Sequence, residues 1–312
     1  MASFAFNFAM DEDDRGAHSS DNAHEFALLA PPPTQHTRRG ERFYWQPTVD
    51  RAACFTHTLI PLGDGAAALP PLAFELVNTA DEAFEARTGA IRGILTTSDL
   101  QAGVYEGGFK LWECSLDLVK YVELLLLGRM GDAAPPFCMP RKVMELGCGH
   151  GLPGIHALLR GAEMVTFMDY NKEVLELTTC PNVFHNARGD ASLFAKTSFY
   201  AGAWASVSEL MQCEEKQTAD QTQYDLILTA ETIYTEAVTI ELNEMIKRHL
   251  RRSPASMALV AAKKYYFGTG GSVQHFLDLV RLEGVFRAEI VWEECDFRSN
   301  IREIVRVAYA SA

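Results

Sequence analysis

The sequence lacks the features that place a chain in a membrane or hold it together by cross-links. None of its apolar runs approaches the ~20 residues that a membrane-spanning helix needs, and its first residues do not follow the pattern of a signal peptide. Its 7 cysteines are odd in number and include no C-x-x-C pair, which favours reduced thiols. We therefore expect a cytoplasmic protein, with the nucleus or nucleolus as a further location.

Metal-ligand patterns and an excess of basic residues are also missing. The 9 histidines do not cluster at the spacings of metal ligands, so we predict no metal site. Lys and Arg number 28 against 41 Asp and Glu, which gives a formal charge of -13. An acidic surface repels nucleic acids and membranes and attracts a basic protein, although it also serves solubility alone. We expect no direct binding to nucleic acid or membrane, and we expect a monomer.

The 312 residues are enough for one large α/β domain with extensions. Residues 1–45 combine an acidic run, a polar stretch and three consecutive prolines, a composition that buries too little apolar surface to offset the entropy of ordering. We predict a disordered tail there and one domain over 46–312. Within this domain, 46–110 is predicted to be an N-terminal extension that covers the site, and 111–312 the catalytic core.

The chain is organised around residues 143–151, where a short apolar run with one carboxylate, Glu145, is followed by glycines at alternate positions. These glycines are Gly147, Gly149 and Gly151. The pattern predicts a buried strand, a tight turn that lets a ligand approach the backbone, and the start of a helix. Further on, a second apolar run ends on Asp169, and an acid at that place accepts hydrogen bonds from both ribose hydroxyls of a nucleoside cofactor.

Two cofactors are compatible with this pair of signals. The run from Gly149 to Gly154 also fits the G-x-G-x-x-G fingerprint of an NAD-dependent dehydrogenase, with Asp169 at a tolerable distance. Such a match is weak alone, because glycine-rich turns between a strand and a helix are common. Glu145 favours a methyltransferase, since a carboxylate is unfavourable beside a pyrophosphate but suits the cationic amino-acid end of S-adenosylmethionine. A structural turn without a ligand is the third interpretation.

Strand-like and helix-like segments alternate along the catalytic core, and two strand-like runs end the chain. The strand-like runs are 143–146, 164–168, 198–200, 224–229, 257–262, 286–292 and 301–309. This succession predicts an α/β fold with a mostly parallel sheet, an antiparallel element at its end and helices on its faces. A plain dinucleotide-binding fold does not usually end in this way, which again favours a methyltransferase.

In an open parallel sheet, ligands bind at the carboxyl ends of the strands. Four such ends are therefore expected to converge: Glu145–Gly151, Asp169–Asn171, Gly202–Trp204 and Thr229–Tyr234. By position, the glycine turn takes the methionine part of the cofactor, Asp169 the ribose, and Trp204 or its neighbours the adenine.

Three residues near these ends have both a functional and a structural interpretation. Glu231 and Tyr234 are expected to face the methyl group and the acceptor, but Glu231 is also in a position to cap the next helix and Tyr234 to be a core residue. Trp112 follows two adjacent glycines and stands among charged residues. It is either a core residue or a wall of the cofactor pocket.

The sequence contains a combination of several motifs. They are G-V-Y-E-G-G-x-K-x-W-E-C from Gly103, E-L-G-C-G-x-G-L-x-G-I from Glu145, D-Y-N from Asp169, P-N-V from Pro181, Y-D-L-I-L-T-x-E-T-I-Y from Tyr224, K-x-Y-F-G-x-G-G from Lys264 and F-x-F-N-F from Phe4. This combination resembles the protein-histidine N-methyltransferases of the methyltransferase-like eighteen family. The match covers about residues 98–312 and the first eight residues.

The resemblance implies a class I fold with a seven-stranded sheet and S-adenosylmethionine as methyl donor. It also implies a histidine of a large-subunit ribosomal protein as the acceptor, methylated on the tele nitrogen. The cofactor contacts it implies are Lys110, Leu111, Trp112, Glu113, Cys114, Gly147, Asp169, Tyr170, Asn171, Gly202, Ala203, Trp204 and Thr229. Two positions depart from the family pattern, since Glu145 replaces a frequent aspartate and Ala203 a frequent acid.

Histidine methylation mainly requires that the reactants are positioned and that the correct imidazole tautomer is held. We hypothesise that Glu231 or a nearby carboxylate accepts the other ring N–H. The nearest alternative is a lysine methyltransferase of the same fold, because Glu231–Tyr234 loosely matches the D-x-x-Y motif of such enzymes. A catalytically idle ribosome-assembly factor is an alternative of another class, against which the retained Glu145, Asp169 and glycines argue.

Overall fold

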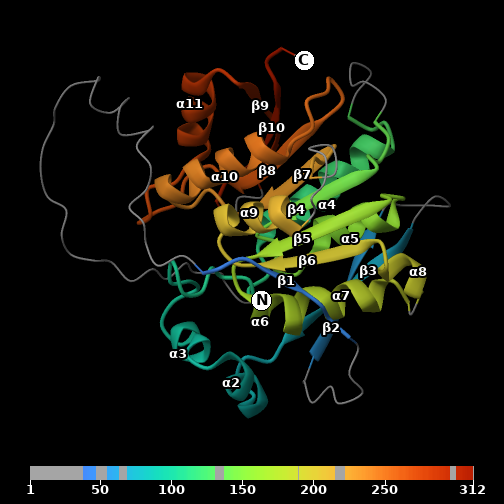
Figure 1. Ribbon diagram of the computed structural model, residues 1–312, viewed down its shortest axis with the longest axis vertical. Helices are drawn as coiled ribbons and strands as arrows, with labels where there is room; N and C mark the ends of the chain where they lie inside the picture. Colours follow the sequence, from blue (N-terminus) through green and yellow to red (C-terminus); the bar gives the residue numbers. More distant parts are fainter. Residues whose placement is uncertain are drawn as a thin grey trace, which may run out of the picture.

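The computed structural model of the chain describes residues 38–46, 55–62, 69–130, 137–188, 190–214, 222–295 and 300–311 (Figure 1). The first 37 residues, with most of the predicted tail and the motif at Phe4, lie outside the described residues. For them the prediction of a disordered tail remains a prediction.

The described residues form one main sheet of eight strands, in the order β1-β6-β5-β4-β7-β8-β10-β9. The strands are β1 (Glu41–Phe43), β4 (Lys142–Leu146), β5 (Met164–Asp169), β6 (Thr197–Ala201), β7 (Leu226–Ala230), β8 (Met257–Lys263), β9 (Phe286–Glu294) and β10 (Arg302–Tyr309). Strands β4 to β8 pair in parallel, whereas β10 runs antiparallel to both β8 and β9. The predicted class I architecture, a mostly parallel seven-stranded sheet with a C-terminal antiparallel strand, is therefore confirmed.

An eighth strand, β1, corrects the predicted boundary of the tail. Residues Glu41–Phe43 pair antiparallel with β6 at the edge of the sheet, with Arg42 opposite Tyr200. The prediction placed these residues in a disordered tail that ends at residue 45, because their composition alone gives no strand pattern. Their order comes from long-range pairing with β6, which no local pattern reveals.

The sheet is covered on both faces by helices. Helices α4 (Glu113–Leu126), α5 (Leu152–Leu159) and α7 (Cys180–Asn186) pack on one face, and α9 (Trp204–Glu214), α10 (Glu236–His249) and α11 (Val273–Glu283) on the other (Figure 1). Side chains on successive strand residues enter opposite cores, as Val143 and Met144 do. This follows from the two-residue period of a strand and explains the continuous apolar runs, because both faces are buried.

The segment before α4, which was predicted to cover the site, contains a hairpin and short helices. Strands β2 (Phe55–Leu62) and β3 (Leu69–Val77) form the hairpin, and α2 (Glu82–Thr88) and α3 (Ile91–Leu95) follow it. Strand β3 of the hairpin packs on α5, α7 and the π-helical turn η2 (Leu175–Thr179), which continues the short helix α6 (Lys172–Val174). A short helix α8 (Ala191–Phe194) leads into β6.

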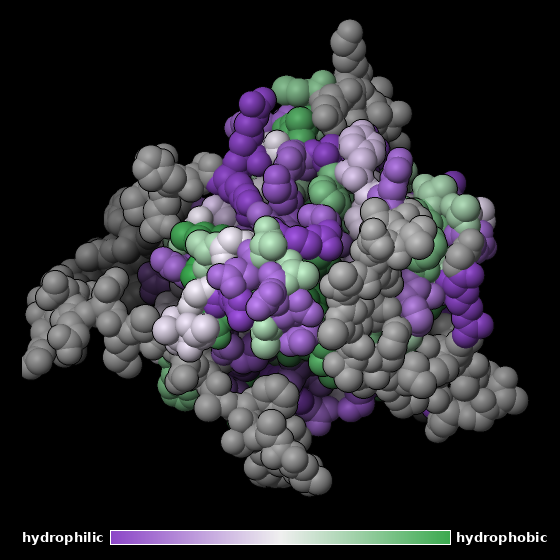
Figure 2. Space-filling view, turned by 90° about the horizontal axis from the view of Figure 1, so that it is seen from below, coloured by the Kyte–Doolittle hydropathy of each residue, from purple (hydrophilic) through white to green (hydrophobic). Residues whose placement is uncertain are grey.

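One face of the molecule shows an ordinary distribution of polar and apolar residues. On the face seen in Figure 2, hydrophobic residues stand in small groups between hydrophilic ones, which is common for protein surfaces. Within the described ranges, no helix combines the length and apolar character required to cross a bilayer. The same ranges contain no group of three or more His, Cys, Asp or Glu side chains arranged to hold a metal ion.

A close packing contact ties α5 to the sheet at Gly154. A Cβ atom there would lie 2.4 Å from Cε1 of Phe167 and 2.6 Å from Oε2 of Glu145, so no side chain fits between helix and strands. The helix therefore approaches the sheet closely at its first turn, next to the glycine loop that follows β4.

We expect Gly154→Ala to lower the free energy of unfolding by about 1–3 kcal/mol, because overpacking a rigid contact forces strain on both elements. Gly93→Ala is the matched control, since a Cβ at Gly93 in α3 meets no atom within 4 Å. Chemical denaturation of both variants measures the difference. Equal stabilities would contradict the close-contact argument.

Candidate active site

A cavity of about 460 Å³ opens at the carboxyl ends of β4 to β7, where the four predicted strand ends meet. Its size is that of a small-molecule site, and its place beside the central strand β4 is the one where ligands bind in open α/β sheets. The predicted site residues that line it are Lys110, Leu111, Trp112, Glu145, Gly147, Gly149, Gly151, Asp169, Tyr170, Gly202, Ala203, Trp204, Glu231 and Tyr234.

Asp169, the last residue of β5, is held by backbone donors. Its Oδ2 accepts the N–H of Gly149 at 3.0 Å and its Oδ1 accepts the N–H of Asn171 at 3.0 Å. Burial raises the pKa of this carboxyl to about 6, against the lowering effect of the two N–H groups. A carboxylate has about four acceptor positions, so two remain for the ribose hydroxyls of a nucleoside.

The glycine loop after β4 turns sharply and starts helix α5. Gly147 and Gly151 have φ angles of +61° and +73°, in the left-handed region that favours glycine. The buried Glu145 carboxylate accepts the N–H of Gly154 at 2.8 Å, and burial raises its pKa well above the usual value. Glu145 therefore fixes the first turn of α5 as well as lining the cavity.

The loop after β6 meets the N-terminal segment of the described chain. The N–H of Ala203 donates to the carbonyl of Arg38 at 3.0 Å, and a Cβ at Gly202 would lie 2.6 Å from the carbonyl oxygen of Arg39. Tyr170 donates from its hydroxyl to the carbonyl of Gly103 at 2.8 Å. Residues just before β1 thus support the end of the cavity predicted to hold the adenine.

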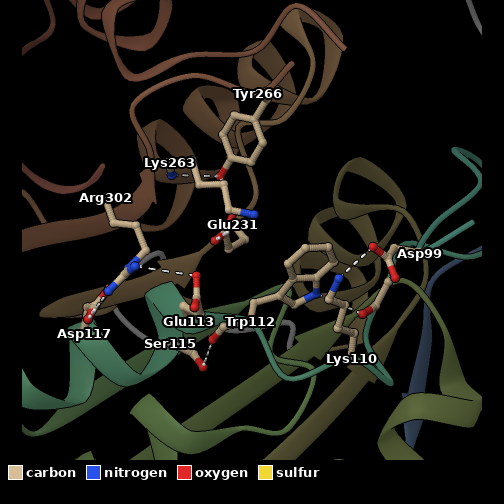
Figure 3. Close-up of polar contacts among 11 residues, drawn as sticks. Asp99, Lys110, Trp112, Glu113, Ser115, Asp117, Glu231, Lys263, Tyr266 and Arg302 are labelled. Carbon is tan, nitrogen blue, oxygen red and sulfur yellow. Dashed lines mark hydrogen bonds and ion pairs between the residues drawn. The ribbon is translucent and has the colours of Figure 1, made fainter. Parts of the chain in front are cut away.

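Trp112 lines the cavity instead of packing in the core. Its indole N–H donates to the carbonyl of Gly107 at 3.0 Å, and the Lys110 ammonium lies 4.6 Å from the ring centroid. Lys110 also pairs with Asp99 at 2.6 Å, beside the indole in Figure 3. This resolves the two sequence interpretations of Trp112 in favour of the pocket wall.

Glu231 follows β7 directly and has a φ angle of +61°, which is rare for a residue with a side chain. Its N–H donates to the carbonyl of Ala261 in the adjacent β8, and the hydroxyl of Tyr266 donates to its Oε2 at 2.7 Å (Figure 3). Its buried Oε1 has no hydrogen-bond partner among the described residues and lies 3.9 Å from Nζ of Lys263. Thr235, not Glu231, caps the following helix.

Tyr234 combines its two predicted interpretations. It lines the cavity but packs in the core beneath it, and its hydroxyl donates to Oε2 of Glu106. Burial and the Glu106 carboxylate raise the pKa of Tyr234 well above its usual value. Burial also raises the pKa values of Glu106 and Glu241, two further carboxyls of the cavity lining.

Four predicted cofactor contacts do not line the cavity and instead support its walls. They are Glu113, Cys114, Asn171 and Thr229. Glu113 faces Arg302, and Cys114 is a buried thiol whose pKa is raised by burial and by the nearby Glu231 carboxylate. Asn171 holds the backbone of Val104 and Glu106, and the Thr229 hydroxyl donates to the carbonyl of Leu146. These four side chains contact the protein itself, and their assignment as cofactor contacts remains a prediction.

The sequence reasoning did not single out Glu106, Glu241 and Tyr266, which all line the cavity. Glu106 and Tyr266 lie inside quoted motifs, so the signal was available, but a motif does not tell which of its side chains point to the ligand. Glu241 lies in the amphipathic α10, where an acid is usually a solvated residue.

The residues of this cavity fit S-adenosylmethionine. Asp169 offers free acceptor positions for a ribose, the glycine loop exposes backbone to the methionine part, and the carboxyl-rich lining suits a sulfonium and an ammonium. The donor carries a methyl group on a positively charged sulfur, and Glu106, Glu231 and Glu241 surround the cavity that receives it.

The sequence model of the lysine methyltransferase family matches residues 97–280, more than half of the chain. The chain belongs to this family. The match begins at Thr97, before α4, and includes the glycine loop and the Glu231 loop. S-adenosylmethionine is therefore its cofactor, as Glu145 and Asp169 indicated, and the dehydrogenase alternative is excluded.

Curated relatives within this methyltransferase family carry a narrower description. The chain is 38% identical over 214 residues to the histidine protein methyltransferase 1 homolog of Dictyostelium discoideum, covering 69% of this chain and 62% of that protein. It is 36% identical over 208 residues to the Bos taurus homolog, covering 61% and 52%. The chain thus spans about half to three fifths of the length of these relatives, and the predicted resemblance is confirmed.

Among solved structures, an O-methyltransferase from Bacillus cereus in complex with SAH aligns at a TM-score of 0.44 and 12% identity, over 72% of this chain and 90% of that chain. The assignment of the fold rests on the strand order and the family match.

We expect the affinity for S-adenosylmethionine to rise as the pH rises through about 6, the pKa of Asp169. Ribose hydroxyls donate to the ionised carboxylate, so ionisation strengthens binding and protonation below pH 6 weakens it. Asp169→Asn should weaken binding about 10- to 100-fold and remove this pH dependence. Isothermal titration from pH 5 to 7 measures both effects. If the Asp169→Asn variant kept the pH dependence, that dependence would belong to another group. Glu289→Gln, at an exposed acid, is the control.

Proposed function

We propose that this protein transfers a methyl group from S-adenosylmethionine to the tele nitrogen of a histidine in a protein. The observation that carries the proposal is the buried Oε1 of Glu231 at the cavity, in a chain that is 38% identical to a histidine protein methyltransferase homolog. This oxygen accepts no hydrogen bond within the described part of the chain, and a neutral imidazole brings one N–H that needs an acceptor.

The residues of the site position the acceptor instead of activating it. The neutral imidazole keeps its proton on one ring nitrogen, which donates to Oε1 of Glu231, so that the lone pair of the other nitrogen is free to attack. The new N–C bond forms while the C–S bond breaks, and its electron pair goes to sulfur. The Glu231 carboxylate then faces the positive charge that develops on the ring.

The substrate of this reaction is proposed to be a basic protein, and a large-subunit ribosomal protein in particular. The formal charge of -13 and the cavity carboxyls Glu106 and Glu241 support a cationic partner. We also propose that the protein acts as a monomer in the cytoplasm and the nucleus.

Transfer to lysine is the second candidate, favoured by the description of the family as lysine methyltransferases. The two candidates share the cofactor and the cavity and differ in the charge of the acceptor. Most lysine side chains arrive as ammonium ions at pH 7, whereas most histidines arrive neutral.

The deciding experiment incubates the protein with labelled S-adenosylmethionine and acid-extracted ribosomal proteins and identifies the labelled amino acid after hydrolysis. The proposal expects τ-methylhistidine. Label in methyl-lysine selects the second candidate, and intact cofactor binding without any label would support a docking role with no catalysis.

We expect Glu231→Gln to lower kcat about 10- to 100-fold while the Kd of S-adenosylmethionine stays within about twofold, because the variant loses a charged acceptor for the ring N–H but no cofactor contact. Glu289→Gln, at an exposed acid that does not line the cavity, is the control and should keep kcat. A Glu231→Gln variant with full kcat would show that Glu231 has no role in the reaction.

A further inference from the structure

We infer that Lys263 makes this site selective for an uncharged acceptor nitrogen, so that an imidazole is accepted and a lysine ammonium is rejected. The inference rests on the proposed function and names the feature of the site that decides between its two candidate acceptors. It assigns Lys263, which does not itself line the cavity, as a residue that acts through Glu231.

Lys263 brings a positive charge to the place where the acceptor binds. It ends β8, and its Nζ lies 3.9 Å from Oε1 of Glu231 and 5.2 Å from the centroid of the Trp112 ring. Glu231 and Trp112 both line the cavity. The Lys263 side chain is only 9% exposed, so water screens its charge little. Figure 3 shows Lys263, Glu231 and Tyr266 gathered beside the indole.

Glu231 forms an ion pair with Lys263, whereas two nearby acids pair with another cation. Arg302, opposite Lys263 in the sheet, pairs with Asp117 at 2.5 Å and with Glu113 at 3.5 Å. The Cys114 thiol stays neutral, since burial raises its pKa well above the usual value. The Glu231–Lys263 pair therefore presents no net charge to the cavity.

The pair leaves one acceptor position for a substrate. Tyr266 occupies Oε2 of Glu231 with its hydroxyl, and Oε1 remains without a hydrogen bond among the described residues. A neutral imidazole N–H needs only such an acceptor. An ammonium ion needs net negative charge and would lie a few ångströms from the Lys263 ammonium, a repulsion that disfavours it about 10- to 100-fold.

Glu106, a further carboxyl of the cavity lining, is already engaged within the protein. Glu106 already accepts from the Tyr234 hydroxyl and from the N–H of Gly103. Burial raises the pKa values of both Glu106 and Glu241, and Glu106 raises that of Glu241 further. Both oxygens of Glu106 already accept hydrogen bonds from the protein itself.

The test uses Lys263→Met, which keeps the length of the side chain and removes its charge, and Lys263→Arg, which keeps the charge. Lys120→Met, at an exposed lysine paired with Glu294, is the matched control. Each protein methylates acid-extracted ribosomal proteins with S-adenosylmethionine, and mass spectrometry of the hydrolysate gives the ratio of methyl-lysine to methylhistidine. We expect this ratio to rise at least about tenfold in Lys263→Met only.

A binding measurement keeps the inference testable if a variant loses activity. Imidazole and n-butylamine, fragments of the two side chains, are titrated by NMR into each protein with S-adenosylhomocysteine. Imidazole should bind the unmodified protein and butylammonium should not, whereas Lys263→Met should gain binding of butylammonium.

The outcomes separate this inference from the proposed function. Methylhistidine from the unmodified protein, with the same product ratio and fragment preference in Lys263→Met, overturns the role of Lys263 and leaves the proposed function standing. Methyl-lysine from the unmodified protein overturns both. Equal gains in Lys263→Met and Lys263→Arg would mean that side-chain shape, not charge, sets the preference, and would also overturn the inference.

Discussion

The carboxylate of Asp169 holds together the segments from which the cofactor site is built. It binds the N–H of Gly149 in the loop after β4 and the N–H of Asn171 in the loop after β5. Asn171 in turn holds the backbone of Val104 and Glu106, in the segment before α4. Gly108 packs so closely on Asp169 that a Cβ would lie 3.1 Å from Oδ2. One buried acid thus fixes three segments that are distant in sequence.

The central part of the fold was predictable because its signals are local. An apolar run followed by glycines gives β4, its turn and α5, and the run ending on Asp169 gives β5. Strand β1 was not predictable, since three residues form a strand only through pairing with β6. The same limit applies to the site. A pattern places Thr229 and Asn171 at strand ends but does not give the direction of their side chains, which here point into the protein.

The loop after β7 stores strain at the place where the chemistry is proposed. Glu231 has a left-handed backbone although it is not glycine, and the bond of its N–H to Ala261 in β8 keeps it there. Such conformations cost about 1–3 kcal/mol and persist where the surrounding structure enforces them. This backbone conformation turns the Glu231 carboxylate toward Lys263 and Tyr266. Lys263 is the last residue of β8, and Tyr266 follows it in the chain. Two adjacent strand ends therefore supply the side of the cavity where the acceptor is proposed to bind.

The short strand β1 determines where a functional fragment of this chain begins. It covers the outer edge of β6, and Arg38, just before it, binds Glu173 with both terminal nitrogens and the N–H of Ala203 with its carbonyl. A fragment that starts at residue 46 would leave unpaired the backbone N–H and C=O groups of β6 that face β1, although β6 would stay paired with β5. Exposed strand edges of this kind recruit other chains. Removing β1 therefore exposes the edge of β6 and makes the protein prone to self-association.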